Sequence, residues 1–389
     1  MIRIILLTEH LDDHIKLLYK GAKRYSYENP GVEIYKMPVL YRYVNGLNEG
    51  VKALLRWGTD VVIGRIVTLD DLQVFRDHNI KVIALESCKR FNGVPHIIGN
   101  HKKLAELCVN YFIDRGHSNF GFFGSGKLRW IDEFSTHCQR IIKEKAQIER
   151  FYAYRFIVRN HPWIESSNDI IEWVKSLPKP IGIICCNDKE AYYLIEVCRQ
   201  CGVVVPSEVA ILGIGNDADL CNLSQPTLSS VSIDTENTGY NLVRDIYKSF
   251  QNGATVFKDT IISASHVVSR KSTNIFANSD AHVSTVLKYI HNNYEKKILV
   301  DNLTQLVPLS RRLLETRFKE ATEDSIYQYI QKLRMTRLAE RLIESKKSIT
   351  NIVLDYEYSD YKNIARQFRQ FKGMSPSEYR ERYLNDKFD

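Results

Sequence analysis

The sequence has no apolar stretch that approaches the roughly 20 residues needed by a membrane-spanning helix. Its first residues, MIRIILLTEHLDDH, hold only a short apolar run before acidic and His residues, so the long apolar region of a secretory signal is missing too. Low-complexity tracts are also absent, and the composition, 44% hydrophobic and 26% charged, is that of a soluble globular protein. We therefore expect a cytoplasmic protein that folds throughout and does not enter a membrane.

Paired cysteine spacings of the kind that bind a metal are lacking, although the sequence holds eight cysteines. Most of them fall inside apolar periodic segments, which favours reduced, buried thiols and no bound metal. The run CRQC at 198–201 is a possible redox pair, but it lies late in a helical pattern and not at a helix start, where a thiolate is stabilised. We predict that these two cysteines are structural.

The length of 389 residues is too great for one ordinary core and predicts two or three domains. The net charge of +8 is compatible with a polyanionic partner but is weak evidence for one. Residues 278–389 hold 20 Lys and Arg against 16 Asp and Glu, so this segment carries the same basic excess as the rest of the chain in far fewer residues. The basic charge is denser toward the C-terminal end.

Short apolar runs alternate with amphipathic helical patterns from residue 2 to about residue 270. Runs without polar alternation are typical of strands buried on both faces of a parallel sheet. Between them, apolar residues recur at spacings of three and four, as in Leu104, Leu107 and Tyr111. Repeated units of this kind predict a doubly wound α/β architecture. The predicted strands are residues 2–8, 32–35, 60–64, 81–86, 119–124, 181–186 and 209–215.

The pattern changes after this part. Residues 271–282, KSTNIFANSDAH, are rich in Ser, Asn and Lys and predict a linker. From Val283 onward no strand-like run stands out, and apolar residues recur at helical spacing. The sequence thus divides into an α/β part at 1–270, a linker at 271–282 and an all-α domain at 283–389.

Two segments of the all-α domain, 301–321 and 348–371, each indicate a helix, a tight turn and a second helix. In the first, Pro308 breaks the helical pattern. The stretch 326–343 between them indicates one long helix that would join the two units rigidly. Rigid separation would place both second helices in successive major grooves, about 34 Å apart.

The second helix of each unit has an apolar stripe on one side and polar, mostly basic side chains on the other. The stripes are Leu314 and Phe318 in one helix and Ile364, Phe368 and Phe371 in the other. A charge run is usually only a solvated helix face, but here two helix-turn-helix units and two basic faces coincide, which favours DNA binding. The predicted DNA-binding residues are Arg311, Arg312, Glu315, Thr316, Tyr361, Lys362, Asn363 and Arg366.

This segment resembles the AraC-type DNA-binding domain. Its end, FRQFKGMSPSEYR, matches the family pattern F-x-x-F-K-G-M-S-P-x-x-Y-R, and the resemblance extends from about Val283 to Tyr383. Pro308 and Glu357 stand at turn positions where the family usually has Gly. The resemblance implies base-facing residues at Arg312, Glu315, Thr316, Lys362, Asn363 and Arg366.

The α/β part offers only weak signs of an enzyme. GFFGSGK at 121–127 follows a predicted strand and has the Gly-x4-Gly-Lys of a phosphate-binding loop, but Leu128 stands where Ser or Thr must bind magnesium. No Ser/His/Asp set is suggested locally, and His10, His14 and His117 are predicted to be surface or capping residues. We therefore predict no enzymatic activity and no cofactor.

Three phrases of the α/β part resemble, in order, successive blocks of the periplasmic-binding-protein-like ligand domain of LacI/GalR regulators. They are DRGHSNFGFFGS, IICCNDKEAYYLIEVCRQCGVVVPSEVAILGIGND and SQPTLSSVSIDTENTGYNLVRDIY. The resemblance implies a two-lobed type I sensor that holds a polar ligand between its lobes. A sensor of this kind followed by an all-α AraC-type domain is the architecture of XylR-type xylose-operon regulators, which implies regulation of xylose or related pentose use.

A sugar pocket needs groups that bracket hydroxyls and an aromatic face for the ring. Polar residues that follow the predicted strands are the candidates, because open α/β sheets bind ligands at the C-terminal ends of their strands. Two alternatives stay open, a helix cap for Asp188 and a core or interface aromatic for Trp130. Gly215 stands where the family commonly has an Asp that holds sugar hydroxyls. The predicted ligand-binding residues are Thr8, Glu9, Asp13, Arg129, Trp130, Asn187, Asp188, Asn216 and Asp217.

Together these features predict a sugar-responsive transcription regulator, with activation of a pentose operon favoured by the resemblance. Its expected partners are double-stranded operator DNA, a pentose effector, RNA polymerase and a second copy of the chain. Two alternatives remain, a regulator that senses a ligand other than a sugar and a DNA-associated enzyme. The enzyme would need a reactive set of residues, which the sequence does not suggest.

Overall fold

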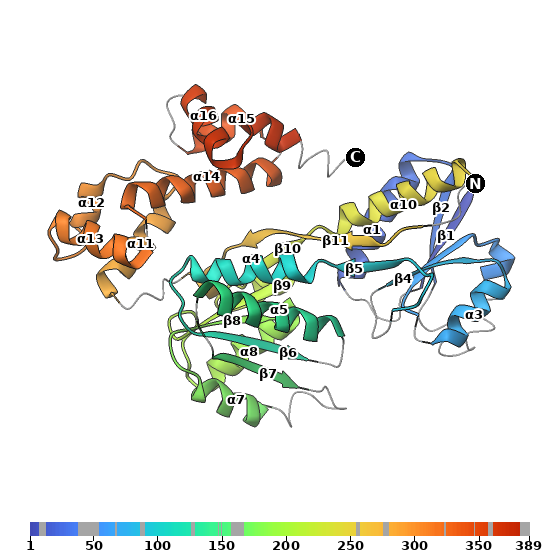
Figure 1. The fold of residues 1–389 in the computed structure, drawn as a ribbon, viewed down its shortest axis with the longest axis horizontal. Coiled ribbons are helices and arrows are strands. Elements are labelled where there is room, and N and C mark those ends of the chain that lie inside the picture. Colours follow the sequence, from blue (N-terminus) through green and yellow to red (C-terminus); the bar gives the residue numbers. More distant parts are fainter. Residues whose placement is uncertain are drawn as a thin grey trace.

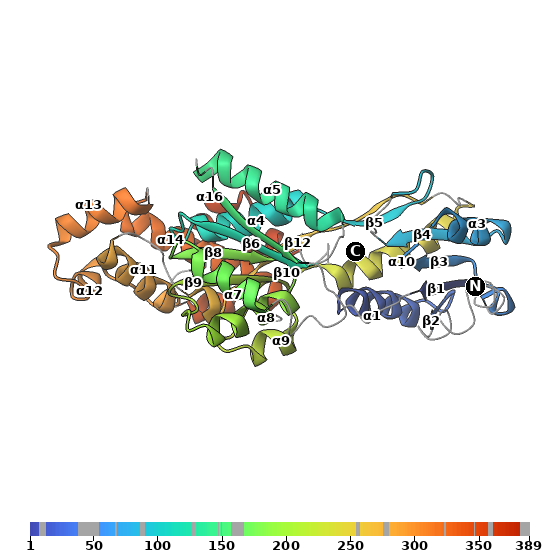
Figure 2. The same ribbon diagram turned by 90° about the horizontal axis from the view of Figure 1, so that it is seen from below.

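The computed structural model forms two α/β lobes followed by a group of helices (Figures 1 and 2). This arrangement confirms the predicted two-lobed sensor and all-α domain. No helix among the described residues is long and apolar enough to cross a membrane. The structure describes residues 1–7, 13–37, 54–66, 68–85, 90–125, 129–146, 148, 150–156, 167–253, 257–274, 280–322, 324–345, 347–356 and 361–381.

The first lobe is built on a parallel six-stranded sheet in the order β11-β5-β4-β3-β1-β2. Alternate residues of β1 face opposite sides, so Ile4 and Leu6 pack beneath α1 and α10, whereas Ile5 and Leu7 pack beneath α3. The elements are β1 (Ile2–Leu7), β2 (Val32–Met37), β3 (Val61–Gly64), β4 (Lys81–Leu85), β5 (His96–Gly99), β11 (Thr260–Ile262), α1 (Asp13–Glu28), α3 (Leu69–Asp77) and α10 (Thr235–Gln251).

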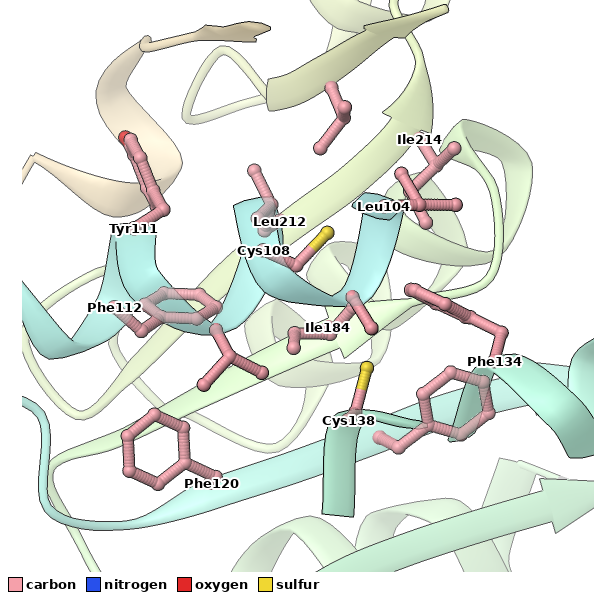
Figure 3. Packing of buried hydrophobic residues seen from close by; sticks show 14 of the residues in the cluster. Leu104, Cys108, Tyr111, Phe112, Phe120, Phe134, Cys138, Ile184, Leu212 and Ile214 are labelled. Atoms are coloured by element: carbon pink, nitrogen blue, oxygen red, sulfur yellow. The ribbon is translucent and has the colours of Figure 1, made fainter. Parts of the chain in front are cut away.

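The second lobe has a six-stranded sheet in the order β12-β10-β9-β8-β6-β7, in which only β12 runs antiparallel to its neighbour. Helices α4 and α5 cover one face through a core that includes Phe112, Phe134 and Ile184 (Figure 3), and α7 and α8 cover the other. The elements are β6 (Phe120–Ser125), β7 (Phe151–Phe156), β8 (Ile181–Cys185), β9 (Val209–Gly215), β10 (Ser229–Ile233), β12 (Ala264–Val268), α4 (His101–Ile113), α5 (Arg129–Ala146), α7 (Ser167–Ser176), α8 (Asp188–Gln200) and α9 (Ala218–Leu223).

The chain crosses between the lobes three times in the described residues. It passes from β5 of the first sheet to α4 of the second lobe, from β10 back to α10, and from β11 to β12. All three crossings lie where the lobes meet (Figure 1). A ligand held between the lobes would therefore touch the segments about which they can turn.

The C-terminal helices form two helix-turn-helix units that share one long helix, α14. Ile326 and Ile330 at its N-terminal end belong to the core of the first unit, whereas Met335, Leu338 and Leu342 belong to the core of the second. Helix α14 confirms the long helix predicted at 326–343. The elements are α11 (Ala281–Asn293), α12 (Val300–Thr304), α13 (Arg311–Thr322), α14 (Ile326–Glu344), α15 (Ile349–Asp355) and α16 (Tyr361–Lys372).

The start of the predicted linker is part of the sensor. Lys271–Thr273 forms a 3₁₀ turn, and Ser272 and Thr273 are fully buried. The Ser272 hydroxyl donates to the Ile211 carbonyl (2.6 Å) and accepts from the Ser229 backbone N–H (2.9 Å). These bonds fix the point at which the chain leaves the second lobe.

Two side chains are placed differently from their predicted positions. His117, expected at the surface or at a cap, is 4% exposed and packs edge-on against Phe112 with ring centroids 5.0 Å apart. Phe371, expected in the apolar stripe of α16, is 42% exposed, while Ile364 and Phe368 are buried as predicted.

The seven described cysteines are free thiols and six of them are buried, as expected for structural residues.

Candidate effector cleft and candidate DNA-binding surface

A cleft of about 720 Å³ lies between the two lobes. It is lined by the C-terminal ends of strands from both sheets and by residues of all three crossings, among them Gly99, Thr235 and Ile262. Its size is that of a small-molecule site, and its position is where open α/β sheets place their ligands.

Trp130 lies in the wall of the cleft, in the first turn of α5. Its ring stacks on His101 of α4, with centroids 5.9 Å apart and planes 29° apart. Glu133 lies 3.6 Å from Nδ1 of His101 and accepts from Arg129 Nε at 2.7 Å. Arg129 thus forms a surface ion pair and is outside the cleft lining of the described residues, whereas the indole of Trp130 is placed to face a ligand.

Asn187 and Asp188 also lie in the cleft wall, after β8, but their polar atoms hold the fold. The Asn187 side chain caps α8 by accepting from the Glu190 N–H at 2.8 Å, so the cap is Asn187 and not Asp188. Asp188 is buried and accepts from the Ser230 hydroxyl and from the backbone N–H of Asp217 (2.7 Å). It therefore joins β8 to the segments that follow β9 and β10.

The segment after β9 is similarly fixed. Asp217 caps α9 by accepting from the backbone N–H groups of Asp219 (2.9 Å) and Leu220 (3.0 Å). Asn216 has a left-handed backbone, with φ of 54°, and its side-chain oxygen accepts from Arg270 Nη2 at 2.9 Å. Both residues line the cleft, yet these oxygens are already bonded within the protein.

The remaining predicted ligand residues precede or begin α1. Thr8 and Glu9 lie outside the described residues. Asp13 is the first residue of α1, and its side chain is also outside the described part of the structure.

Other polar residues line the cleft that the sequence analysis did not select. Arg65 directly follows β3, so the rule applied to the other strand ends would have identified it. Thr235 follows β10, a strand that was not predicted. Thr235 lines the cleft, and its hydroxyl is buried and has no hydrogen-bond partner among the described residues.

In the first helix-turn-helix unit, α13 exposes the predicted DNA-binding residues. Leu314 and Phe318 are fully buried, and Arg311, Arg312, Glu315 and Thr316 lie on the exposed side. Arg311 Nη1 lies 3.1 Å from Asp301 and its Nε lies 3.0 Å from Glu315, whereas Arg312 has no ion pair with another described residue. Arg312 is thus the guanidinium that can turn to DNA without breaking an existing pair.

In the second unit, the predicted residues lie at the start of α16. Tyr361, Lys362 and Asn363 form its first turn, but their side chains lie outside the described part of the structure. Arg366 is exposed on α16, while Ile364 and Phe368 face the core. The exposed side of α16 therefore includes Arg366, which stands two residues after the first core residue of its helix, as Thr316 does in the first unit.

Two regions of the chain match known families. Residues 109–273 match a periplasmic binding protein-like domain, and residues 303–382 match a helix-turn-helix domain. The first match ends at Thr273, the last residue of the buried 3₁₀ turn. The two matches cover most of the second lobe with part of the first and nearly all of the two helix-turn-helix units.

Relatives with known roles share both parts. The xylose operon regulatory protein of Escherichia coli K12 is 25% identical over 335 residues, which cover 82% of this chain and 83% of that protein. The protein of the same name from Haemophilus influenzae is 27% identical over 290 residues, 74% of each chain. A solved structure of a xylose-binding transcription activator, xylR, matches with a TM-score of 0.57 and 22% identity over 97% of both chains. These relatives are transcription regulators and not enzymes.

Proposed function

We propose that this chain, a XylR-like regulator with a periplasmic-binding-protein-like sensor before a C-terminal AraC-type helix-turn-helix domain, binds a pentose between its lobes and activates transcription from operator DNA. Xylose is the first candidate, because the relatives are named for the xylose operon. Operator binding places the protein in the cytoplasm, with RNA polymerase as its further partner.

The observation that carries the proposal is the composition of the cleft wall. A free buried hydroxyl at Thr235, the guanidinium of Arg65 and the indole of Trp130 supply a hydrogen-bonding group, a donor and an aromatic face. Carboxylates and cations both occur around the cleft, which suits an uncharged polyhydroxyl ligand. Such donors and a flat apolar face are what a pentose ring requires.

The proposed mechanism begins with closure of the lobes. A ligand that touches both lobes favours the closed arrangement by the difference between its affinities for the closed and open states. Closure then changes the arrangement of two chains in a homodimer and moves their helix-turn-helix units onto paired operator half-sites. Sedimentation velocity with and without operator DNA tests the dimer, and a strict monomer at micromolar concentration in both conditions would overturn that part.

A thermal-shift screen of the full chain tests the effector class. D-xylose, L-arabinose, D-ribose, hexoses, sugar phosphates and nucleotides are compared with buffer. A bound ligand stabilises the folded state by about 2.7 kcal/mol at a hundredfold excess over its Kd. We expect a selective shift with D-xylose. A shift only with sugar phosphates or nucleotides would replace the pentose with an anionic effector and leave the DNA-binding role unchanged.

A further inference from the structure

Helix α4 runs from the cleft to the point where the chain leaves the sensor. At its start, Asn100 caps the helix and its backbone N–H donates to the Ile262 carbonyl of another crossing segment (2.8 Å). Asn100, His101 and Leu104 line the cleft. The 13 residues of the helix span about 20 Å, at about 1.5 Å per residue. One rigid element therefore has its first turn at the cleft and its last turn at the far side of the second lobe.

The body of α4 is fixed to the second lobe. Leu104, Cys108 and Phe112 point from one side of the helix into the core above the sheet (Figure 3). Close packing of this kind makes a helix move as a unit with little bending. A displacement at the start of α4 is thus carried to its end.

The last turn of α4 is bonded to the segment that leads to the linker. The Tyr111 hydroxyl lies 2.7 Å from Ser269 Oγ and 2.6 Å from Thr273 Oγ1. The Arg115 guanidinium lies 3.5 Å from the centre of the Tyr111 ring and donates to the Tyr111 carbonyl (3.2 Å) and to Ser269 Oγ (3.4 Å). Thr273 is bonded in turn to Ser229 Oγ (2.6 Å). The end of α4 and the exit of the chain thus form one buried polar cluster.

The same arginine faces the helix-turn-helix domain. Arg115 is 6% exposed. Tyr329 and Arg337, both on α14, affect the pKa of Arg115. Arg115 in turn lowers the pKa of His291 on α11. Nε2 of His291 lies 2.9 Å from the Tyr329 hydroxyl. Beside them, Asp114 is within electrostatic reach of Lys332 and Asp324. Helices α11 and α14 lie at this end of the second lobe in both views (Figures 1 and 2).

The charges at this contact oppose one another in part. Burial lowers the pKa of Arg115, and the neighbouring Arg337 lowers it further. Burial lowers the pKa of His291 as well, and both arginines act in the same direction. Each guanidinium lies over a tyrosine ring of its own domain, Arg115 over Tyr111 and Arg337 over Tyr294. The like charges of Arg115 and Arg337 therefore oppose the approach of α14 to the end of α4.

We propose that the C-terminal end of α4 is a coupling surface that holds α11 and α14 against the sensor, and that an effector in the cleft changes this contact through the first turn of α4. Because α14 belongs to the cores of both helix-turn-helix units, one contact orients both units. The docking stands on the structure alone, whereas its control by a sugar rests on the proposed function. Arg115 acts as a positioning residue.

The first test measures coupling between D-xylose and operator DNA in the full chain. Arg115→Met keeps the apolar stem and removes the charge, and Tyr329→Phe removes only the hydroxyl bonded to His291. Arg140→Met, at an exposed i,i+4 pair with Glu144 on α5, is the matched control. We expect D-xylose to change operator affinity about tenfold in the wild type and in the control, within the usual range of allosteric coupling. In Arg115→Met the change should fall below about twofold, with D-xylose and operator each still bound.

The second test needs no effector. Hydrogen exchange of the ligand-free chain should show faster exchange over residues 326–337 in Arg115→Met and Tyr329→Phe than in the wild type and Arg140→Met. Unchanged protection in both variants would mean that α14 is not held against the end of α4. If D-xylose changes operator affinity in both variants as much as in the wild type, the effector does not act through this contact. If D-xylose does not change operator affinity in the wild type while hydrogen exchange changes as expected, the proposed effector is wrong and the docking surface is supported.

Discussion

At the scale of single residues, the polar side chains that line the cleft differ in how far the fold already uses their hydrogen-bonding atoms. A residue that follows a strand and begins a helix faces the ligand site and is also where a helix needs a cap. In this chain the second demand is met by Asn187 and Asp217, whose oxygens accept from helix N–H groups. The hydroxyl of Thr235 has no hydrogen-bond partner among the residues that the structure describes, and the strand before it was not predicted.

Thr235 provides a direct test of the pocket. Thr235→Val keeps the shape of the side chain and removes a hydroxyl that makes no bond within the described protein. We expect unchanged or slightly higher stability and D-xylose affinity reduced about twofold to twelvefold, the loss of one hydrogen bond of about 0.5–1.5 kcal/mol. Isothermal titration calorimetry measures the affinity. Thr238→Val is the matched control, because its hydroxyl donates to the Asp234 carbonyl within α10; an equal loss in both variants would remove Thr235 from the site.

The two adjacent arginines of α13 should differ in their effect on DNA binding. Arg312→Ala should weaken operator binding by about 1–3 kcal/mol if the guanidinium reads a base, and should relax sequence preference at one position. Arg311→Ala should cost less, because Arg311 is already paired with Asp301 and Glu315 and gives up those contacts on turning to DNA. Fluorescence anisotropy with a panel of operator variants measures both. Equal losses would mean that the ion pairs do not hold Arg311 away from DNA.

His117 predicts a loss of stability in acid. Burial, and then the charge of Arg115, lowers its pKa to about 3 from an ordinary value near 6.5, so it is neutral in the folded protein. Below pH 6.5 the unfolded chain binds the proton and the folded chain does not, so stability falls as pH decreases from 6.5 toward 3. At pH 5 the loss from this group is about 2 kcal/mol. Urea unfolding between pH 7 and 5 should show a shallower decline in His117→Gln, and an identical decline would exclude this residue as the cause.

At the scale of helices and strands, prediction worked where apolar periodicity alone determines the element. All seven predicted strands are present; six are runs buried on both faces of a sheet, whereas the edge strand β2 buries Val32 and Ile34 and exposes Tyr35. The strands that were missed are short, lie at or near a sheet edge, or mix polar with apolar residues. In β10, Ser229 and Ser230 are fully buried because their hydroxyls bond to the segment at 270–273 and to Asp188. Those partners are distant in sequence, so no local pattern could indicate the strand.

The packing of α1 against α10 is an element-scale feature with a clear test. A Cβ on Gly21 would lie 1.7 Å from the Glu236 carbonyl oxygen, and one on Gly239 would lie 2.1 Å from that of Leu18. The helices must therefore separate to admit even one methyl group. Gly239→Ala should destabilise the first lobe by about 1–3 kcal/mol or more. The urea midpoint measures this, with the exposed Lys248→Ala on α10 as control, expected within about 0.5 kcal/mol of wild type. A stable Gly239→Ala would mean that the helices pack less closely.

At the scale of the whole molecule, the two halves of the chain are specialised in complementary ways. In the described residues, the α/β part joins its two lobes by three crossings, which permits rotation, whereas the helix-turn-helix domain joins its two units by the single continuous helix α14, which does not. The linker predicted at 271–282 begins with three residues that lie in a 3₁₀ turn packed on the second lobe. Its Ser-rich composition also fits Ser272 and Thr273, whose buried hydroxyl bonds fasten the chain to the second lobe. Composition alone cannot distinguish a free polar segment from one whose polar groups are satisfied inside the fold.

The rigid connection of the two helix-turn-helix units through α14 leads to a prediction about operator spacing. Helix α14 has 19 residues and spans about 28 Å, and its two ends are built into the two cores, so α13 and α16 of one chain have a fixed separation and rotation. One chain is expected to contact two operator subsites, one through α13 and one through α16. Insertion of 5 base pairs between these subsites should weaken binding by more than about 3 kcal/mol. Several contacts are lost, and each mismatched base pair costs about 1–3 kcal/mol. Insertion of 10 base pairs restores the rotational phase but not the distance, so it should not rescue binding. Anisotropy titrations at one salt concentration measure both operators, with a 10-base-pair insertion outside the subsites as control. Rescue by the inner 10-base-pair insertion would show that the two units move independently, and that α14 does not hold them in one orientation.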